Sequence, residues 1–258
     1  MSDTILETEG LTKEFRGFVA VSDVALKVRR GSIHALIGPN GAGKTTCFNL
    51  LTNFLPPTRG RITYNGRDIT RMKPAQVARL GLVRSFQISA VFPHITVLEN
   101  VRVALQRQRG GSFDFWRSEA LLRQYDERAM QLLGDVGLTD YVSALAGSLP
   151  YGRKRALEIA TTLAMDPEMM LLDEPTAGMT HDDVDRIVAL VKRVAVGRTV
   201  LLVEHNLKVV QGLCDRITVL ARGQVLAEGD YASVSANPEV IAAYLGTDPG
   251  VSGAVAHV

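Results

Sequence analysis

The chain lacks several features that would assign it to a specialised class of protein. Only two of its 258 residues are cysteine, Cys47 and Cys214, and their spacing fits no metal-binding or redox motif. No run of about 18 apolar residues occurs, so no membrane-spanning helix is expected. The N-terminal MSDTILETEG is acidic and has no apolar core of a secretory signal. We therefore expect buried thiols in a soluble, intracellular protein.

Charge of one sign is also missing. The chain has 29 Lys and Arg residues against 27 Asp and Glu residues, which gives a formal net charge of +2. Because the two signs of charge are nearly balanced, there is no electrostatic reason to expect a nucleic-acid partner.

What the sequence does contain is an alternation of strand and helix patterns. Hydrophobic residues make up 46% of the chain, enough for the core of one large or two modest domains. Strand patterns occur at 4–9, 19–28, 32–38, 61–69, 169–174, 199–205 and 216–229. The range 61–69 contains an Asn-Gly pair, which predicts a hairpin turn. Helical spacing follows 32–38 in TTCFNLLTNF, and an apolar helix face within 182–194 holds Val184, Ile187, Val188, Val191 and Val194. Strands that alternate with helices indicate an α/β fold with a parallel sheet.

A helical block interrupts this alternation from about residue 88 to 165. We expect one domain over 1–246, with a core formed by about 1–87 and 160–230 and a helical subdomain inserted at about 88–159. The final residues, 247–258, have the composition of a loose tail.

The segment GPNGAGKT, Gly38 to Thr45, matches the phosphate-loop pattern G-x-x-x-x-G-K-[ST] between a predicted strand and a predicted helix. Glycines let successive backbone N–H groups wrap a triphosphate, and the helix adds its positive N-terminal end. Lys44 would reach the β- and γ-phosphates, and the Thr45 hydroxyl would coordinate Mg²⁺. The alternative, a chance glycine-rich turn, does not explain the strand and helix on either side.

The run MMLLDE, residues 169–174, supports the same chemistry. Four apolar residues predict a buried strand, and Asp173 at its carboxyl end is placed to hold Mg²⁺ directly or through water. Glu174 would then polarise the attacking water. The alternative is an ordinary strand end with two solvated acids. Together with the phosphate loop, the run predicts a nucleotide hydrolase.

These motifs, with four further elements in the same order, resemble the ATP-binding cassette (ABC) proteins over nearly the whole chain. The resemblance implies an ABC nucleotide-binding domain: a P-loop NTPase core with a parallel sheet, an antiparallel β subdomain and the inserted helices. It implies that Phe15 stacks on adenine, that Gln87 contacts Mg²⁺ and the attacking water, and that His205 is the switch histidine near the γ-phosphate. Taken alone, these three residues have ordinary readings as a packing aromatic, a loop amide and a structural histidine.

LPYGR, residues 149–153, occupies the place of the family signature, commonly LSGGQ. In the family this loop caps a helix and contacts the γ-phosphate bound by a second cassette, and a proline at the first helical position is compatible with that geometry. Pro150 lacks the usual hydroxyl and N–H, a loss that Arg153, Lys154 and Arg155 would offset by charge. For Lys154 and Arg155 a solvated helix face is the open alternative. The resemblance thus implies ATP-binding residues Phe15, Gly38, Pro39, Asn40, Gly41, Ala42, Gly43, Lys44, Thr45, Thr46, Leu149, Pro150, Tyr151, Gly152 and Arg153, metal-binding residues Thr45, Gln87 and Asp173, and catalytic residues Glu174, His205 and Gln87.

Within the family, the chain is similar to bacterial ATP-binding subunits of branched-chain amino acid importers, in FQISAVFPHITVLENV, DEPTAGM, LLVEHNLKVV and NPEVIAAYLG. This implies ATP and Mg²⁺ as cofactors, a second cassette, transmembrane permease subunits, indirectly a periplasmic binding protein, and a peripheral place on the cytoplasmic face of the inner membrane. The run at 88–95 would line a groove for the permease or pack internally, and His181 would face a partner subunit. A soluble family relative outside transport, and a nucleotide-gated interaction module with weak hydrolysis, stay open as alternatives.

Overall fold

The computed structural model describes residues 3–85, 91–108 and 123–245. The chain forms two compact units, one of Met1–Val77 with Thr199–Val258 and one of Ala78–Arg198. Within the described ranges, no helix is both long enough and apolar enough to cross a membrane. Helix α2 (Pro74–Arg79) lies where the chain passes from the first unit to the second.

The first unit contains an antiparallel sheet whose strand order is β2-β1-β5-β6, with β3 also paired to β1. Its strands are β1 (Thr4–Phe15), β2 (Phe18–Val24), β3 (Lys27–Arg29), β5 (Arg59–Tyr64) and β6 (Arg67–Asp68). The predicted Asn-Gly hairpin is confirmed, because Asn65 (φ 50°) and Gly66 (φ 74°) join β5 to β6 with positive φ at both turn positions. The predicted strand 19–28 is two strands, because β2 ends at Val24 and β3 begins at Lys27; Asp23 (φ 55°) lies near the end of β2, where the β1–β2 register is irregular.

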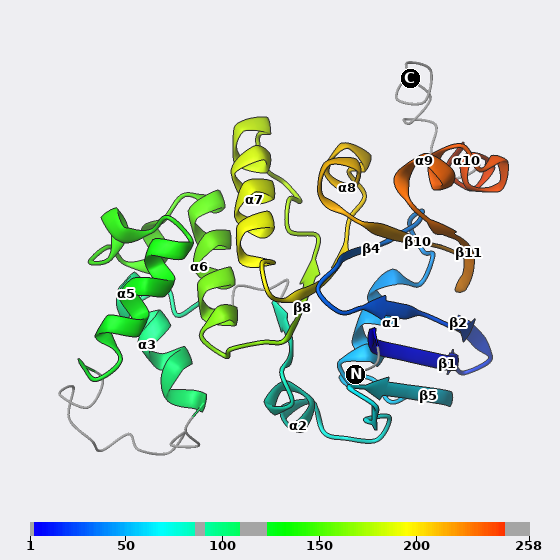
Figure 1. Ribbon diagram of the computed structural model, residues 1–258, viewed down its shortest axis with the longest axis horizontal. Coiled ribbons are helices and arrows are strands. Elements are labelled where there is room, and N and C mark those ends of the chain that lie inside the picture. Colours follow the sequence, from blue (N-terminus) through cyan, green and yellow to red (C-terminus); the bar gives the residue numbers. More distant parts are fainter. Residues whose placement is uncertain (1–2, 86–90, 109–122, 246–258) are drawn as a thin grey trace. The chain divides into compact units, whose positions relative to one another are not determined.

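The same unit contains parallel strands in the order β10-β4-β9, with β11 antiparallel to β10. These strands are β4 (Ile33–Ile37), β9 (Thr199–Val203), β10 (Arg216–Ala221) and β11 (Gln224–Gly229). Every residue of β9 is buried, as expected of an apolar strand covered on both faces. The unit's helices are α1 (Lys44–Leu51), α8 (Leu207–Leu213), α9 (Tyr231–Ser235) and α10 (Pro238–Leu245), of which α9 and α10 pack against β11 (Figure 1).

The second unit contains a parallel strand pair, β7 (Leu82–Ser85) and β8 (Met169–Asp173), and a group of helices. The helices are α3 (Val97–Gln108), α5 (Asp126–Asp135), α6 (Tyr151–Leu163) and α7 (His181–Val194), with short 3-10 turns η1 (Thr139–Tyr141) and η2 (Ala146–Ser148). Helices α3, α5 and α6 pack against one another (Figure 1).

Local sequence explains where two of these helices begin. The Glu99 carboxylate accepts from the backbone N–H and the hydroxyl of Thr96, and the Thr96 hydroxyl accepts from the backbone N–H of Glu99. These bonds form a capping box at the start of α3. The Thr180 hydroxyl caps α7 by accepting from the backbone N–H of Asp183. The predicted apolar face of α7 is only partly the buried one, because Leu190 is buried in addition and Val184 and Val188 are only half-buried.

Candidate nucleotide-binding site

The phosphate loop joins β4 to α1, and two of its glycines are required by their surroundings. A Cβ added at Gly38 (φ 150°) would lie 2.1 Å from the carbonyl oxygen of Leu220. At Gly43 (φ 98°) it would lie 2.5 Å from the carbonyl oxygen of Ala20. Backbone atoms cannot move aside cheaply, so any side chain at these positions would distort the loop.

Helix α1 presents its N-terminal end to the same loop. It begins at Lys44, and its N-cap residue, Gly43, has no side chain that could cap it, so the helix end is a place where an anion could bind. The Lys44 side chain is buried and curls over the loop, where its Nζ donates to the carbonyl oxygens of Gly38 (2.6 Å) and Pro39 (3.0 Å). Thr45 is exposed. A cradle of close-packed glycines, an open helix end and an ammonium group fits the phosphates of a nucleotide.

The predicted adenine-stacking residue ends the first strand of the antiparallel sheet. Phe15 is 41% exposed, with the Lys13 Nζ 5.1 Å from its ring centroid. Its partner across the β1–β2 pair is Phe18, which is 68% exposed. Sequence reasoning missed Phe18, because only the pairing of β1 with β2 shows that it lies opposite Phe15. Both rings offer a face on which a base could stack.

The predicted switch histidine follows β9 directly. The His205 side chain is exposed, while its backbone N–H donates to the Glu204 carboxylate (3.2 Å). Glu204 is fully buried, and sequence reasoning missed it. The following residue, Asn206, caps α8 through the backbone N–H groups of Lys208 and Val209. The loop is therefore held by its own polar groups, with the imidazole directed to solvent.

In the second unit, Asp173 ends β8 and Glu174 follows the strand directly. Asp173 is 1% exposed, and its Oδ2 accepts from the Arg84 guanidinium at 2.5 Å. Its Oδ1 is buried and has no hydrogen-bond partner among the described residues. A buried carboxylate oxygen without a donor fits a Mg²⁺ ligand, directly or through water. Glu174 (φ 45°) has the left-handed backbone conformation, which is strained for a residue with a side chain.

No ready-made metal cluster accompanies Asp173. Among residues 3–85, 91–108 and 123–245, no group of three or more His, Cys, Asp or Glu side chains is arranged to hold a metal ion. Mg²⁺ in nucleotide sites needs only one or two protein ligands, since phosphate oxygens and water complete its shell.

The signature segment places its residues differently from one another. Leu149 is buried, Tyr151 is 58% exposed, and Pro150 is the N-cap of α6. Pro150 was expected at the first helical position, and it lies one position before that residue. A Cβ at Gly152 would lie 3.0 Å from a carboxylate oxygen of Asp183, so this glycine lets α6 and the start of α7 approach closely.

The cations after the signature do not form one charged group. Arg153 donates to the carbonyl oxygen of Gly137 (2.9 Å), and its guanidinium lies 5.2 Å from the Tyr141 ring centroid. Arg155 is 8% exposed, so a solvated helix face is wrong for this residue.

Arg155 instead forms an internal connection. It donates to the Glu158 carboxylate (2.6 Å) and to the carbonyl oxygen of Asp173 (2.5 Å). Its charge is neutralised within α6, and its second bond ties this helix to the end of β8. Only the fold, which brings Arg155 to the carbonyl oxygen of Asp173, could show this role.

Other predicted residues lie outside the described ranges. Gln87 and the start of the run at 88–95 fall there. The described end of that run contains Phe92, which is 55% exposed, so this residue at least is not packed internally.

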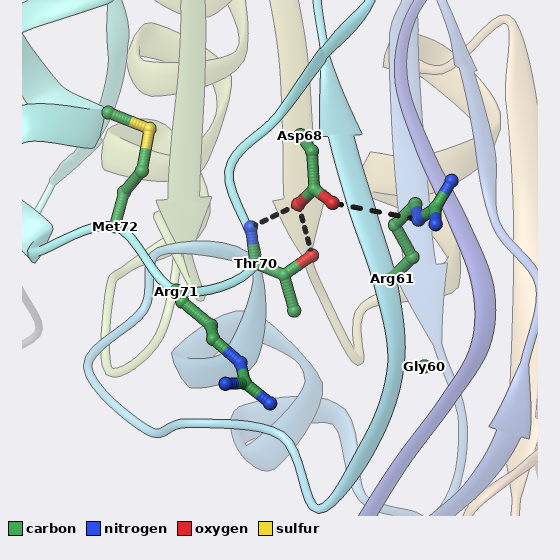
Figure 2. Close-up of a pocket in the computed structure, with 6 residues that line it drawn as sticks. All are labelled: Gly60, Arg61, Asp68, Thr70, Arg71 and Met72. Atoms are coloured by element: carbon green, nitrogen blue, oxygen red, sulfur yellow. Dashed lines mark hydrogen bonds and ion pairs between the residues drawn. The ribbon is translucent and has the colours of Figure 1, made fainter.

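One open pocket of about 490 Å³ in the first unit contains none of the predicted residues. Figure 2 shows its lining of Gly60, Arg61, Asp68, Thr70, Arg71 and Met72. The Asp68 carboxylate accepts from the Thr70 hydroxyl (2.6 Å) and backbone N–H (2.9 Å), which lowers the pKa of Asp68. The hydrogen bonds drawn there hold the β6 end together and resemble no catalytic arrangement.

Comparison with known proteins agrees with this geometry. The family model described as "ABC transporter" matches residues 21–177. A solved structure titled as the ADP conformation of MJ1267, an ATP-binding cassette of an ABC transporter, superposes with a TM-score of 0.83 at 31% identity, covering 95% of this chain and 100% of that one. The chain belongs to the ABC transporter family and has its ATP-binding, ATP-hydrolysing cassette fold. The predicted fold class and the resemblance are confirmed.

Within that family, the matches point to one group. The model "Branched-chain amino acid ATP-binding cassette transporter" matches residues 224–249. BraF of Pseudomonas aeruginosa, a high-affinity branched-chain amino acid transport ATP-binding protein, is 41% identical over 256 residues, covering 95% of this chain and 99% of its own. LivG of Escherichia coli K12, with the same description, is 39% identical over 258 residues at the same coverage. The chain is a member of the group of branched-chain amino acid transport ATP-binding proteins.

Proposed function

We propose that this chain powers the uptake of branched-chain amino acids, or of a related small polar solute, as a Mg²⁺-dependent ATPase on the cytoplasmic face of the membrane. Its partners would be a second cassette, transmembrane permease subunits and, indirectly, a periplasmic substrate-binding protein. The relatives with nearly full-length matches carry this activity in their names. The observation that carries the proposal is the glycine-lined loop that leads into α1, with the Lys44 ammonium group against its carbonyl oxygens.

The chain's own residues would divide the binding of ATP between them. Lys44 would leave the carbonyl oxygens that it now contacts and bind the phosphates, which carry far more negative charge. The first N–H groups of α1 would bind phosphate oxygens without reorganisation. Phe15 would stack on the adenine, since its ring is exposed. Thr45, Asp173 and Gln87 would hold Mg²⁺, which neutralises phosphate charge during the reaction.

Hydrolysis would depend on Glu174 and His205. Glu174 would orient and deprotonate the attacking water, and its left-handed backbone conformation is of the strained kind that clusters at active sites. His205 is exposed at the end of β9 and can donate to or accept from a phosphate oxygen. The signature of a second cassette, from Leu149 to Arg153, would close the nucleotide site between two copies.

The test is phosphate release by the full chain assembled with its co-purified membrane subunits. Glu174→Gln should lower the turnover number at least about 100-fold, the usual contribution of a positioned general base, and leave ATP binding intact. Lys44→Ala should abolish binding itself. Glu127→Gln, an exposed carboxylate on α5, is the matched control and should leave both unchanged.

Two results would contradict the proposal. Phosphate release that persists in Glu174→Gln would show that another group activates the water. A chain that purifies without any membrane subunit and hydrolyses ATP alone would favour a role outside transport.

A further inference from the structure

Arginine side chains from two elements contact different parts of Asp173, the last residue of β8. Arg84 on β7 donates to its carboxylate, whereas Arg155 on α6 donates to its backbone carbonyl oxygen at 2.5 Å. That carbonyl belongs to the peptide group that joins Asp173 to Glu174, and a peptide group is planar. Arg155 therefore restrains the peptide plane that leads into Glu174.

The backbone at Glu174 has a conformation that requires such restraint. Its φ of 45° lies in the left-handed region, which a residue with a side chain keeps only where the surrounding structure holds it. On the other side, the carbonyl oxygen of Glu174 accepts from the backbone N–H of Ala177 at 3.1 Å. Hydrogen bonds therefore restrain the peptide groups both before and after Glu174.

The Arg155 guanidinium can occupy this place because its charge is neutralised on its own helix. One of its nitrogens, Nη1, donates to the Glu158 carboxylate at 2.6 Å, and the other, Nη2, donates to the carbonyl oxygen of Asp173. The planar guanidinium directs its donors in fixed directions, which the single ammonium group of a lysine does not. One side chain thus pairs within α6 and also reaches the end of β8.

We infer that Arg155 is a positioning residue for Glu174, in which the guanidinium holds the peptide group that precedes the general base. The inference rests on the proposed function, since it assumes that Glu174 activates the attacking water. Catalysis depends strongly on geometry, and a displacement of about 1 Å can lower the rate on the order of 100-fold. Arg155 would act through the backbone of Glu174, so removing it should slow hydrolysis and leave the affinity for ATP unchanged.

The experiment measures phosphate release, and binding of a fluorescent N-methylanthraniloyl ATP, by the full chain assembled with its membrane subunits. Arg155→Met combined with Glu158→Leu removes the guanidinium together with its counter-charge, so no charge is left buried and the fold should stay intact. We expect the turnover number to fall about 10- to 100-fold and the affinity for ATP to stay within about twofold of the wild type. Arg193→Met, the same change at an exposed arginine on α7, is the matched control and should leave both unchanged.

A second comparison shows whether Arg155 acts through Glu174. In Glu174→Gln the general base is already absent, so its position no longer matters. Adding Arg155→Met and Glu158→Leu to this variant should therefore lower the residual phosphate release by less than about twofold. A merely structural role would lower the residual release by the same factor as in the wild type.

Each outcome decides one question. A turnover number of the Arg155→Met, Glu158→Leu variant within about twofold of the wild type would overturn the inference and leave the proposed function standing. Loss of ATP binding together with turnover would also overturn it, because Arg155 would then support the fold as a whole. The same holds for an equal reduction in the presence and absence of Glu174. Phosphate release that persists in Glu174→Gln would instead refute the proposed function, on which the inference rests.

Discussion

Replacing Arg155 with methionine tests how the signature helix is tied to β8. Arg155 is 8% exposed and Glu158 is 7% exposed, and their side chains meet at 2.6 Å. Removing the guanidinium would leave the Glu158 carboxylate buried without its partner, which typically costs about 3 kcal/mol or more. The carbonyl oxygen of Asp173 would lose its donor as well, at about 1 kcal/mol. We expect Arg155→Met to lower the free energy of unfolding by about 4 kcal/mol.

The double variant Arg155→Met with Glu158→Leu separates these two costs. It leaves no charge buried, so only the loss at Asp173 remains and the penalty should fall to about 1–2 kcal/mol. In thermal unfolding of the full chain, the single variant should melt roughly 10 °C below the wild type and the double variant only about 3–5 °C below it. A double variant as unstable as the single one would refute the reasoning, because the unpaired carboxylate could not then be the main cost.

Three further predictions concern single positions. Burial lowers the pKa of His34 from 6.5 to about 4. As the pH falls, the unfolded chain therefore binds a proton before the folded chain does. Stability that is present above about pH 6.5 is then lost as the pH falls toward 4. Urea unfolding should show that the free energy of unfolding falls by about 2 kcal/mol between pH 7.5 and 5. The same fall with pH in His34→Gln would contradict this origin. Gly38→Ala should abolish binding of fluorescent ATP, because the added Cβ would collide with the Leu220 carbonyl oxygen. At Gly41 a Cβ would meet nothing within 4 Å, so Gly41→Ala should cost only about 1 kcal/mol of stability for its φ of 78°. Equal binding by both variants would refute the steric argument. Pro150→Ser should leave phosphate release equal or faster and should raise the melting temperature slightly. A serine at the N-cap can supply the side-chain hydrogen bond that Pro150 does not make to α6. A clear drop in turnover with the fold intact would contradict this prediction.

The local structure of contiguous motifs could be predicted from the sequence. The phosphate loop, the run that ends in Asp173 and the Asn-Gly hairpin each follow from residues a few positions apart, whose backbone requirements are local. The strand-like stretch at 216–229 was less clear, because Arg222 (φ 50°) and Gly223 (φ 79°) turn the chain into two antiparallel strands there. A turn of two residues interrupts an apolar pattern too briefly to be recognised in it.

Side chains whose partners lie far away in the sequence could not be interpreted in this way. Helical spacing made Arg155 a plausible surface residue, although its two acceptors bury it. Nothing in LVRSFQ shows that Arg84 pairs with Asp173, a contact that arises because β7 and β8 are neighbours. Burial and pairing depend on which elements meet, and periodicity within one element does not contain that information.

The sequence alone thus predicted the chemistry of the site, because a glycine-rich loop with one lysine and an apolar run that ends in two carboxylates are patterns typical of nucleotide binding. Tertiary structure decided which groups surround those residues: Leu220 lies behind Gly38, Asp183 lies against Gly152, and Arg155 donates to the carbonyl oxygen of Asp173. The physical reason is that a phosphate loop is built from consecutive backbone amides, whereas its supports come from strands and helices that only folding brings together.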